Sequence, residues 1–329
     1  MNKDSKFLRV LQAKCWEPIA VTFAALFMVG AVAQAAIIPF NNEMHGFFGT
    51  SDYAEVKAEG EAATAIDRHR LKTEDEIEAY YRQVNQEVES EGLVLLKNEN
   101  AALPLSSGSK VAFALSGTGR IIYATHGPGV RRDGEKEGAF YDLRKALKEE
   151  TDLNVNDATF DFLETGAGKT ARGQKSGTFF VNEPSWATYS PVAGEYDDST
   201  VIAVISRESG EGGDASYTGS DGIDGSYLSL TSNELEILEQ LGSLKNQGKV
   251  KKIVVLINSA LNVRCDFIDD DRYGIDAAMW IGLPGATGMK GVADALVGKV
   301  NPSGRLSDTF VKNNFSSPAA FSQSTIQKV

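Results

Sequence analysis

One apolar segment near the N-terminus constrains this chain more than any other feature. From Ile19 to Phe40 the only polar side chains are Thr22 and Gln34. At about 1.5 Å per residue, a helix over this range reaches the ~30 Å of a bilayer core. A buried core helix is the alternative, but one modest domain would then have to cover an apolar cylinder on all sides. The segment therefore predicts a transmembrane or signal-anchor helix over residues 19–40.

The charges beside this segment predict its direction. The residues before it carry more basic than acidic side chains: Lys3, Lys6, Arg9 and Lys14 against Asp4 and Glu17. By the positive-inside rule, we expect residues 1–18 in the cytoplasm and the chain after Phe40 outside it. Ala33-Gln34-Ala35 has the small-x-small form of a signal-peptidase site, so secretion after cleavage near Ala35 is an alternative. The apolar run continues past that site, which favours retention in the cell membrane.

Composition argues against several classes of function. With 45 acidic and 33 basic side chains the net charge is −12, and no basic patch offsets it, so we expect no nucleic-acid partner. Cys15 and Cys265 lie on either side of the apolar segment, which argues against a disulfide framework. The three histidines lack metal-ligand spacing. We therefore expect neither a metal nor a cofactor.

A folded domain is predicted to begin near Thr73. Residues 41–72 are polar and rich in small side chains, as expected of a stalk. The run Thr73-Glu74-Asp75-Glu76 forms a capping box. Apolar side chains follow at helical spacing and predict an amphipathic helix towards Ser90: Ile77, Tyr81, Val84 and Val88. We place the domain at residues 73–312 and a polar linker at 313–329.

Within this domain, short apolar runs alternate with helical patterns. The predicted strands cover residues 110–116, 200–206, 251–257 and 276–281, and the predicted helices cover residues 141–150, 232–246 and 288–297. Continuous apolar strands alternating with helices are typical of a mostly parallel sheet covered on both faces. We therefore expect an α/β fold, a three-layer αβα sandwich. Its functional loops should follow the carboxyl ends of the strands.

The most informative of these loops follows the strand at 200–206 and reads RESGEGGD, from Arg207 to Asp214. Glycines on both sides of Glu211 allow a tight turn and a close approach to a ligand. A projecting carboxyl group can then exchange a proton in a cleft. The same composition also occurs in plain solvated turns, so the loop alone does not decide between the two interpretations.

Four motifs, taken together, carry a family resemblance. They are EGLVLLKNE at 91–99 with LPL at 103–105, VISRESGEG at 204–212, WIGLPG at 280–285 and GKVNPSGRLSDTF at 298–310. Their order and spacing resemble the α/β sandwich domain of glycoside hydrolase family 3, the β-glucosidase and β-xylosidase family. The resemblance covers roughly Glu87 to Phe310.

This resemblance implies a retaining glycosidase whose (β/α)8 barrel supplies an aspartate nucleophile. The sandwich supplies the general acid/base, and Glu211 matches that position. Retention requires the two carboxyl groups to lie about 5–5.5 Å apart. Glu208 is the local competitor, but it lies outside the Gly-Glu-Gly core, and we expect it to be solvated or salt-bridged.

Substrate contacts are expected in the same loop and in one other. Asp214 either orients a sugar hydroxyl or caps the loop. A glycine-rich stretch after the first predicted strand matches a family loop near the substrate cleft, although a plain flexible loop is the alternative. The candidate contacts are Arg207, Ser209, Gly210, Asp214, Gly127 and Gly129.

The chain departs from the whole enzyme because it holds no barrel's worth of strand–helix units. We therefore expect it to be the N-terminal part of a longer polypeptide that places the sandwich before the barrel. The partners would be that barrel, the membrane through residues 19–40, and an oligosaccharide or β-glycoside substrate. The alternative is a non-catalytic extracytoplasmic carbohydrate-binding domain.

Overall fold

A computed structural model describes residues 3–37, 73–125, 140–169, 171–175, 177–211, 213, 215–216, 220–314 and 316. The chain divides into two compact units, Met1–Arg70 and Leu71–Val329. In the first unit, α1 (Lys3–Ile37) contains a stretch, Pro18–Ala35, that is long and apolar enough to cross a membrane. A signal sequence meets the same criterion, so α1 is a candidate for either role. The predicted stalk at 41–72 lies outside the described residues.

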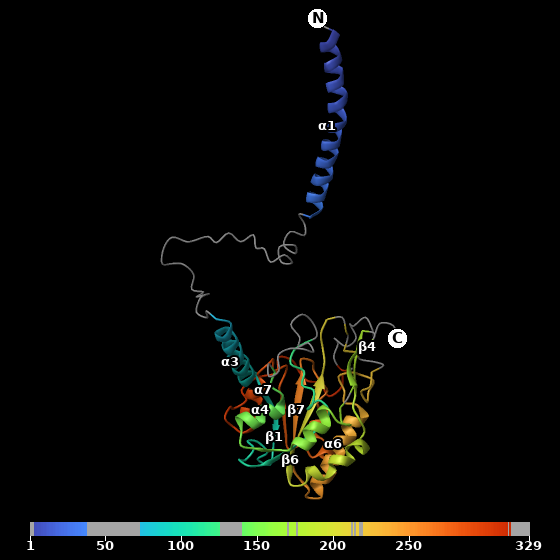
Figure 1. Cartoon of the computed structure of the whole chain (residues 1–329). Coiled ribbons are helices and arrows are strands. Elements are labelled where there is room, and N and C mark those ends of the chain that lie inside the picture. Colours follow the sequence, from blue (N-terminus) through green and yellow to red (C-terminus); the bar gives the residue numbers. More distant parts are fainter. Residues whose placement is uncertain are drawn as a thin grey trace. The chain divides into compact units, whose positions relative to one another are not determined.

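The second unit is built on a six-stranded sheet of order β1-β8-β7-β6-β2-β3 (Figure 1). Strand β1 runs antiparallel to β8, and every other neighbouring pair is parallel. The strands are β1 (Val94–Asn98), β2 (Lys110–Ala114), β3 (Asn154–Val155), β6 (Ser199–Arg207), β7 (Val250–Ser259) and β8 (Ala277–Trp280). The prediction of a mostly parallel sheet is confirmed, and its four predicted strands correspond to β2, β6, β7 and β8.

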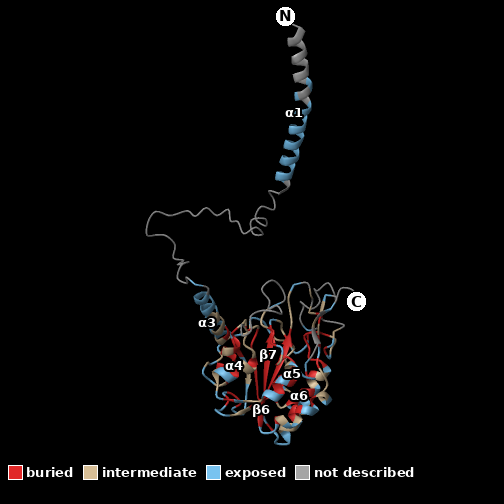
Figure 2. Cartoon of the chain, in the orientation of Figure 1, coloured by how far each residue is buried: buried red, intermediate tan, exposed pale blue. Residues whose placement is uncertain are grey.

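The centre of the sheet is dry because both of its faces are covered. Every residue of β6 is buried (Figure 2). Every residue of β7 is buried too, except Lys251 and Lys252 near its start. Strands covered on both sides read as continuous apolar runs rather than as an alternation. This explains why β6 and β7 appear in the sequence as continuous apolar runs.

Helices form the two outer layers. On one side, α3 (Glu74–Gly92) and α4 (Leu143–Glu150) both contact α7 (Met289–Leu296). On the other, α5 (Asp157–Glu164) and α6 (Ser232–Asn246) share contacts with the 3₁₀ segment η2 (Trp186–Tyr196). The crossovers through α4 and α6 lead in opposite directions along the sheet, and right-handed crossovers then lie on opposite faces. The result is the expected three-layer arrangement.

Two capping boxes fix the starts of α3 and α6. Thr73 accepts from the amide of Glu76, whose carboxylate accepts from the amide of Thr73, as predicted. For α6 the cap is Thr231, paired with Glu234, rather than Ser232, which is the first helical residue. At the other end of the unit, Asn314 is buried and donates to Ser229 Oγ at 2.9 Å. The folded unit therefore extends past residue 312.

Three of the four apolar side chains that predicted α3 are exposed. Ile77, Tyr81 and Val88 are 40%, 66% and 63% exposed, whereas Val84 is partly buried and Glu89 is buried. The polar side bonds to the α7 region, where Gln86 donates to Asp294 at 3.2 Å. The spacing predicted the helix but not which of its sides contacts the domain.

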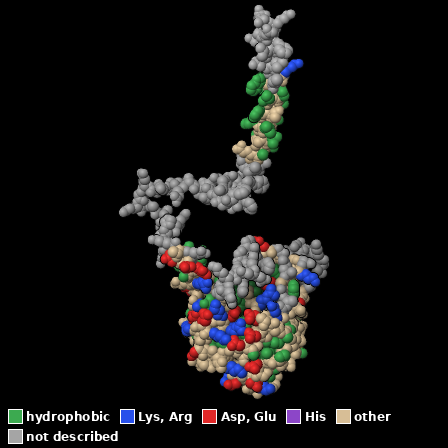
Figure 3. Space-filling view, in the orientation of Figure 1, with side chains coloured by type: hydrophobic (Ala, Val, Ile, Leu, Met, Phe, Trp, Pro, Cys, Tyr) green, Lys and Arg blue, Asp and Glu red, His purple; other side chains and the backbone are tan. Residues whose placement is uncertain are grey.

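A second, smaller sheet lies beside the main one. It is a hairpin of β4 (Ala171–Lys175) and β5 (Thr178–Asn182). Its apolar side forms a small core of its own, made of Phe179, Val181, Tyr227 and Leu228. The hairpin is thus packed against the segment that returns from the loop after β6. On the face drawn in Figure 3, acidic and basic side chains of the described residues are interspersed.

Candidate functional site

The candidate acid/base loop leaves the sheet at the carboxyl end of β6 and returns at Thr231, the cap of α6. Glu211 is exposed on it, and Ser209 and Gly210 beside it are partly exposed. Gly210 has φ 153°, a backbone conformation that residues with a Cβ rarely adopt. The glycine before Glu211 is therefore required by the path of the chain.

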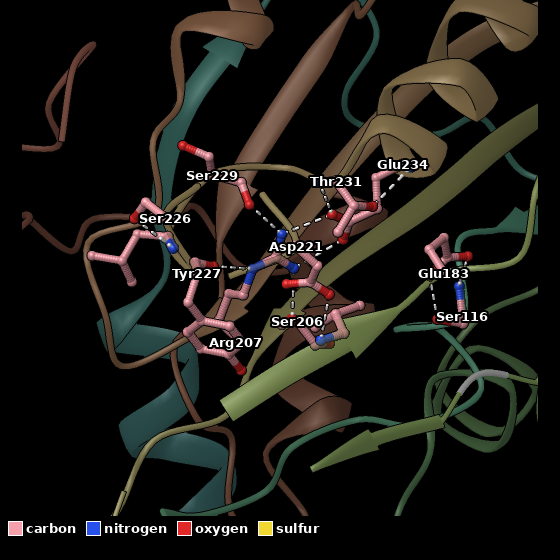
Figure 4. Close-up of polar contacts among 12 residues, drawn as sticks. Ser116, Glu183, Ser206, Arg207, Asp221, Ser226, Tyr227, Ser229, Thr231 and Glu234 are labelled. Atoms are coloured by element: carbon pink, nitrogen blue, oxygen red, sulfur yellow. Dashed lines mark hydrogen bonds and ion pairs between the residues drawn. The ribbon is translucent and has the colours of Figure 1, made fainter. Parts of the chain in front are cut away.

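Beneath the loop lies a buried ion pair between Arg207 and Glu234 (Figure 4). The side chains are 1% and 3% exposed, and the guanidinium meets the carboxylate in a bidentate pair with N–O distances of 2.9 and 2.7 Å. The remaining N–H groups donate to three backbone carbonyls, those of Ser206, Tyr227 and Ser229. A guanidinium has five N–H groups, and all of them are therefore satisfied here.

Both members of the pair are held in their charged forms. Burial alone would raise the pKa of Glu234, but the charge and hydrogen bonds of Arg207 outweigh it and lower that pKa below its ordinary value. Burial likewise opposes the charge on Arg207, and the Glu234 carboxylate nevertheless raises the pKa of the guanidinium. Because each charge is satisfied by the other, removing one partner would leave a buried charge uncompensated.

Hydrogen bonds also tie the two arms of the loop together above this pair. The amide of Glu208 donates to the hydroxyl of Tyr227 at 2.7 Å, and the amide of Tyr227 donates to the carbonyl of Ser216 at 2.8 Å. A bridge joins Gly222 to Thr231. Glu208 departs from the expectation of a solvated or paired side chain, because its Oε2 is buried and has no hydrogen-bond partner among the described residues.

Asn258, in β7, joins the neighbouring loops at this edge of the sheet. Its Oδ1 accepts from the amide of Ile122 at 2.7 Å and from Ser206 Oγ at 3.1 Å. Its Nδ2 donates to the carbonyls of Ile122 and Gly282 at 2.9 and 2.8 Å. One fully satisfied amide therefore holds the loops after β2 and β8 and the end of β6. Only its polarity within an apolar strand marks this residue in the sequence.

A buried carboxylate fixes the end of β2 in a similar way. Glu183 accepts from the amide of Ser116 at 2.9 Å, from the Ser116 hydroxyl, and from Tyr189 at 3.3 Å. Next to these loops, Trp280 at the end of β8 donates to the carbonyl of Ser259 at 2.8 Å. Sequence reasoning missed Asn258, Glu183 and Tyr227, because no motif spacing connects them with their partners.

The predicted site residues fall into three groups. Glu211, Ser209 and Gly210 lie together on the exposed part of the loop. Arg207 lies below them, with its guanidinium turned into the protein. Asp214, Gly127 and Gly129 lie outside the described residues. Within the described ranges, no group of three or more His, Cys, Asp or Glu side chains is placed to hold a metal ion.

Comparison with known proteins decides the family. The family model described as the glycosyl hydrolase family 3 C-terminal domain matches residues 93–328. The chain belongs to glycosyl hydrolase family 3. The resemblance of its four motifs is thereby confirmed, and the mixed sheet with its helices is the α/β sandwich of this family.

Among curated relatives, β-glucosidase A of Butyrivibrio fibrisolvens is 30% identical over 246 residues, covering 68% of this chain and 28% of that protein. The β-glucosidase of Ruminococcus albus is 30% identical over 235 residues, covering 68% and 22% respectively. Exo-1,4-β-xylosidase xlnD of Aspergillus niger is 25% identical over 245 residues, 73% of this chain and 26% of that protein. The chain thus spans less than a third of the length of these family members.

Solved structures give the same result. β-Glucosidase 3B from Thermotoga neapolitana in complex with glucose superposes with a TM-score of 0.58 at 26% identity, over 76% of this chain and 33% of that one. A β-glucosidase from Paenibacillus barengoltzii superposes with a TM-score of 0.57 at 25% identity, over 72% and 25%. The family-3 sandwich is therefore shared, whereas most of each relative has no counterpart here.

Proposed function

We propose that this chain carries the general acid/base of a retaining, β-glucosidase-like glycosidase that hydrolyses terminal β-linked sugars outside the cytoplasm. One observation carries the proposal: Glu211 is an exposed carboxylate on a loop whose two ends are fixed by a buried ion pair. Membership of family 3 and relatives named as β-glucosidases and β-xylosidases support it. The substrate class is an oligosaccharide or another β-glycoside.

In this proposal Glu211 acts twice. It first donates a proton to the departing glycosidic oxygen, and it then removes a proton from the water that hydrolyses the glycosyl-enzyme. The nucleophile is an aspartate of a (β/α)8 barrel in another part of the same polypeptide. That carboxyl group would lie about 5–5.5 Å from the carboxyl group of Glu211 when the domains are assembled.

The remaining site residues take supporting roles. Ser209, Gly210 and Asp214 would contact the sugar from the loop itself, and Gly127 and Gly129 from the glycine-rich stretch. Arg207 is better placed to hold the loop than to contact substrate, because its five N–H groups are satisfied inside the protein.

The test is Glu211→Gln in the polypeptide at its natural length. Glutamine keeps the shape but donates no proton, so rates on substrates with poor leaving groups should fall about 10²–10⁴-fold. Activated aryl β-glycosides need little protonation in the first step, so their glycosyl-enzyme should accumulate. Azide needs no general base and should restore turnover, with a β-glycosyl azide as the product.

Glu208→Gln is the matched control, because it changes a carboxylate of the same loop. It should retain turnover and show no response to azide. Azide rescue of Glu208→Gln, with wild-type behaviour of Glu211→Gln, would move the acid/base to Glu208. Absence of any azide effect in both variants would contradict the proposed function.

A further inference from the structure

Tyr227 contacts two consecutive residues at the start of the acid/base loop. Its carbonyl accepts from Arg207 Nε at 2.8 Å (Figure 4). Its hydroxyl accepts from the amide of Glu208 at 2.7 Å. The side chain is 1% exposed. Glu208 lies three positions before Glu211, so this hydroxyl holds the backbone that leads to the candidate acid/base.

The position of this contact matters because the sheet ends there. The parallel register of β6 and β7 runs as far as Arg207 and Ser259, so Glu208 is the first residue beyond the ladder. A buried backbone amide without a partner at this point would destabilise the fold. The Tyr227 hydroxyl supplies the acceptor that a neighbouring strand no longer provides.

The ring of Tyr227 contacts Phe179 and Arg207. It stacks on Phe179 of β5 with the ring centroids 5.9 Å apart and an interplanar angle of 30°. The guanidinium carbon of Arg207 also lies 5.7 Å from the ring centroid. The ring is thus held by the hairpin, through Phe179, and by the buried ion pair, through Arg207.

We infer that Tyr227 is a positioning residue for Glu211. This inference rests on the proposed function. Between Glu208 and Glu211 the chain passes through Gly210, whose φ of 153° lies in a region that glycine explores freely. Fixing the Glu208 amide limits the swing of this short segment. A displacement of about 1 Å in a catalytic group can cost on the order of 10²-fold in rate.

The test compares Tyr227→Phe with Tyr196→Phe. Tyr196 is also fully buried, and its hydroxyl donates to the carbonyl of Phe113 at 2.9 Å in the main core. Each variant keeps its ring and removes one buried hydroxyl, so any general loss of stability is matched. Only Tyr227→Phe removes the acceptor from Glu208.

Two measurements are made. In the chain described here, hydrogen exchange of the Glu208 amide should become at least about 10-fold faster in Tyr227→Phe and stay unchanged in Tyr196→Phe. In the natural-length polypeptide, Tyr227→Phe should lower kcat/KM about 10- to 100-fold for glycosides with poor leaving groups. It should lower kcat/KM much less for activated aryl glycosides, because kcat/KM reports the first step, in which these substrates need little protonation.

A purely structural tyrosine would not produce this dependence on the leaving group. Equal exchange in the two variants, or equal loss of kcat/KM on both kinds of substrate, would overturn the inference. The azide test on Glu211→Gln decides the proposed function separately. If Glu211→Gln is rescued by azide while Tyr227→Phe behaves like Tyr196→Phe, the inference fails and the proposed function stands.

Discussion

Glu89 is a carboxylic acid buried on the side of α3 that faces the start of α7. Its side chain is 9% exposed, and Oε1 has no hydrogen-bond partner among the described residues. A Cβ placed on Gly288 would lie 3.0 Å from the Cβ of Glu89, so the two backbones approach closely here. Burial raises the pKa of Glu89 to about 8. The carboxyl group is therefore protonated in the folded protein at neutral pH.

The raised pKa predicts how stability depends on pH. Between about pH 4.5 and 8 the folded state retains a proton that the unfolded chain releases, so the free energy of unfolding should fall as pH rises, by at most about 1.4 kcal/mol per unit. Glu89→Gln has no proton to release, so its stability relative to the wild type should rise by up to about 4 kcal/mol between pH 4 and pH 8. Urea unfolding across this range measures both.

Glu87→Gln is the control for this experiment, because Glu87 is exposed on the same helix. It should keep the wild-type slope of stability against pH. A Glu89→Gln curve parallel to that of the wild type would show that Glu89 titrates in the folded protein much as it does in the unfolded chain.

At the scale of single residues, the sequence predicts the candidate reactive side chain better than the side chains that hold its loop in place. The glycines around Glu211 predicted an exposed carboxylate on a loop, because that property depends on adjacent residues. The roles of Tyr227 and Asn258 depend on contacts across 19 and 136 positions, which no local pattern records. The burial of Glu208 Oε2 was not predicted for the same reason, since it depends on the folded arrangement.

Among the elements, α3 and α7 cross at small residues. A Cβ on Gly291 of α7 would lie 2.6 Å from Ser90 Oγ and 3.0 Å from the carbonyl oxygen of Gln86, both on α3. The Ser90 hydroxyl would have to rotate away, and the backbone of α3 would have to shift by a few tenths of an ångström. Glycine at this position therefore allows α3 to lie directly on α7.

Gly291→Ala should push the two helices apart. We expect a net loss of about 1–3 kcal/mol in the free energy of unfolding, even though alanine improves helix propensity by about 1 kcal/mol. Hydrogen exchange should become faster in α3 and remain slow in β6 and β7. Gly92→Ala is the control, because a Cβ there meets nothing within 4 Å. Equal stability of the two variants would contradict the close crossing.

Two of the strands that the sequence did not predict lack a continuous apolar run. Strand β4 has the sequence ARGQK, which neither alternates nor carries an apolar face. Strand β3 is only two residues long and pairs with β2 at the edge of the sheet. Burial on both faces made β6 and β7 recognisable, and edge elements lack that signal.

For the whole molecule, topology is the property that needs testing. Protease added outside intact cells should degrade the chain after Phe40, because basic residues precede the apolar segment and are expected to stay inside. Terminal epitopes followed by immunoblotting give the readout, with a cytoplasmic protein as the control. Cys265 is a poor labelling site, since burial raises the pKa of its thiol to about 12. Complete protection in cells with an accessible envelope would contradict this topology.

The exposed apolar side chains of α3 also affect the choice of boundaries for recombinant expression of the sandwich domain. The family match begins at residue 93, after α3 has ended. A recombinant domain starting there would lose the hydrogen bond between Gln86 and Asp294 and would expose the surface of α7 around Gly291. Starting at Thr73 keeps the capping box and the helix, but it also keeps Tyr81 and Val88 on the surface. A start at Thr73 therefore gives the complete fold, whereas a start at residue 93 gives a surface with fewer exposed apolar side chains.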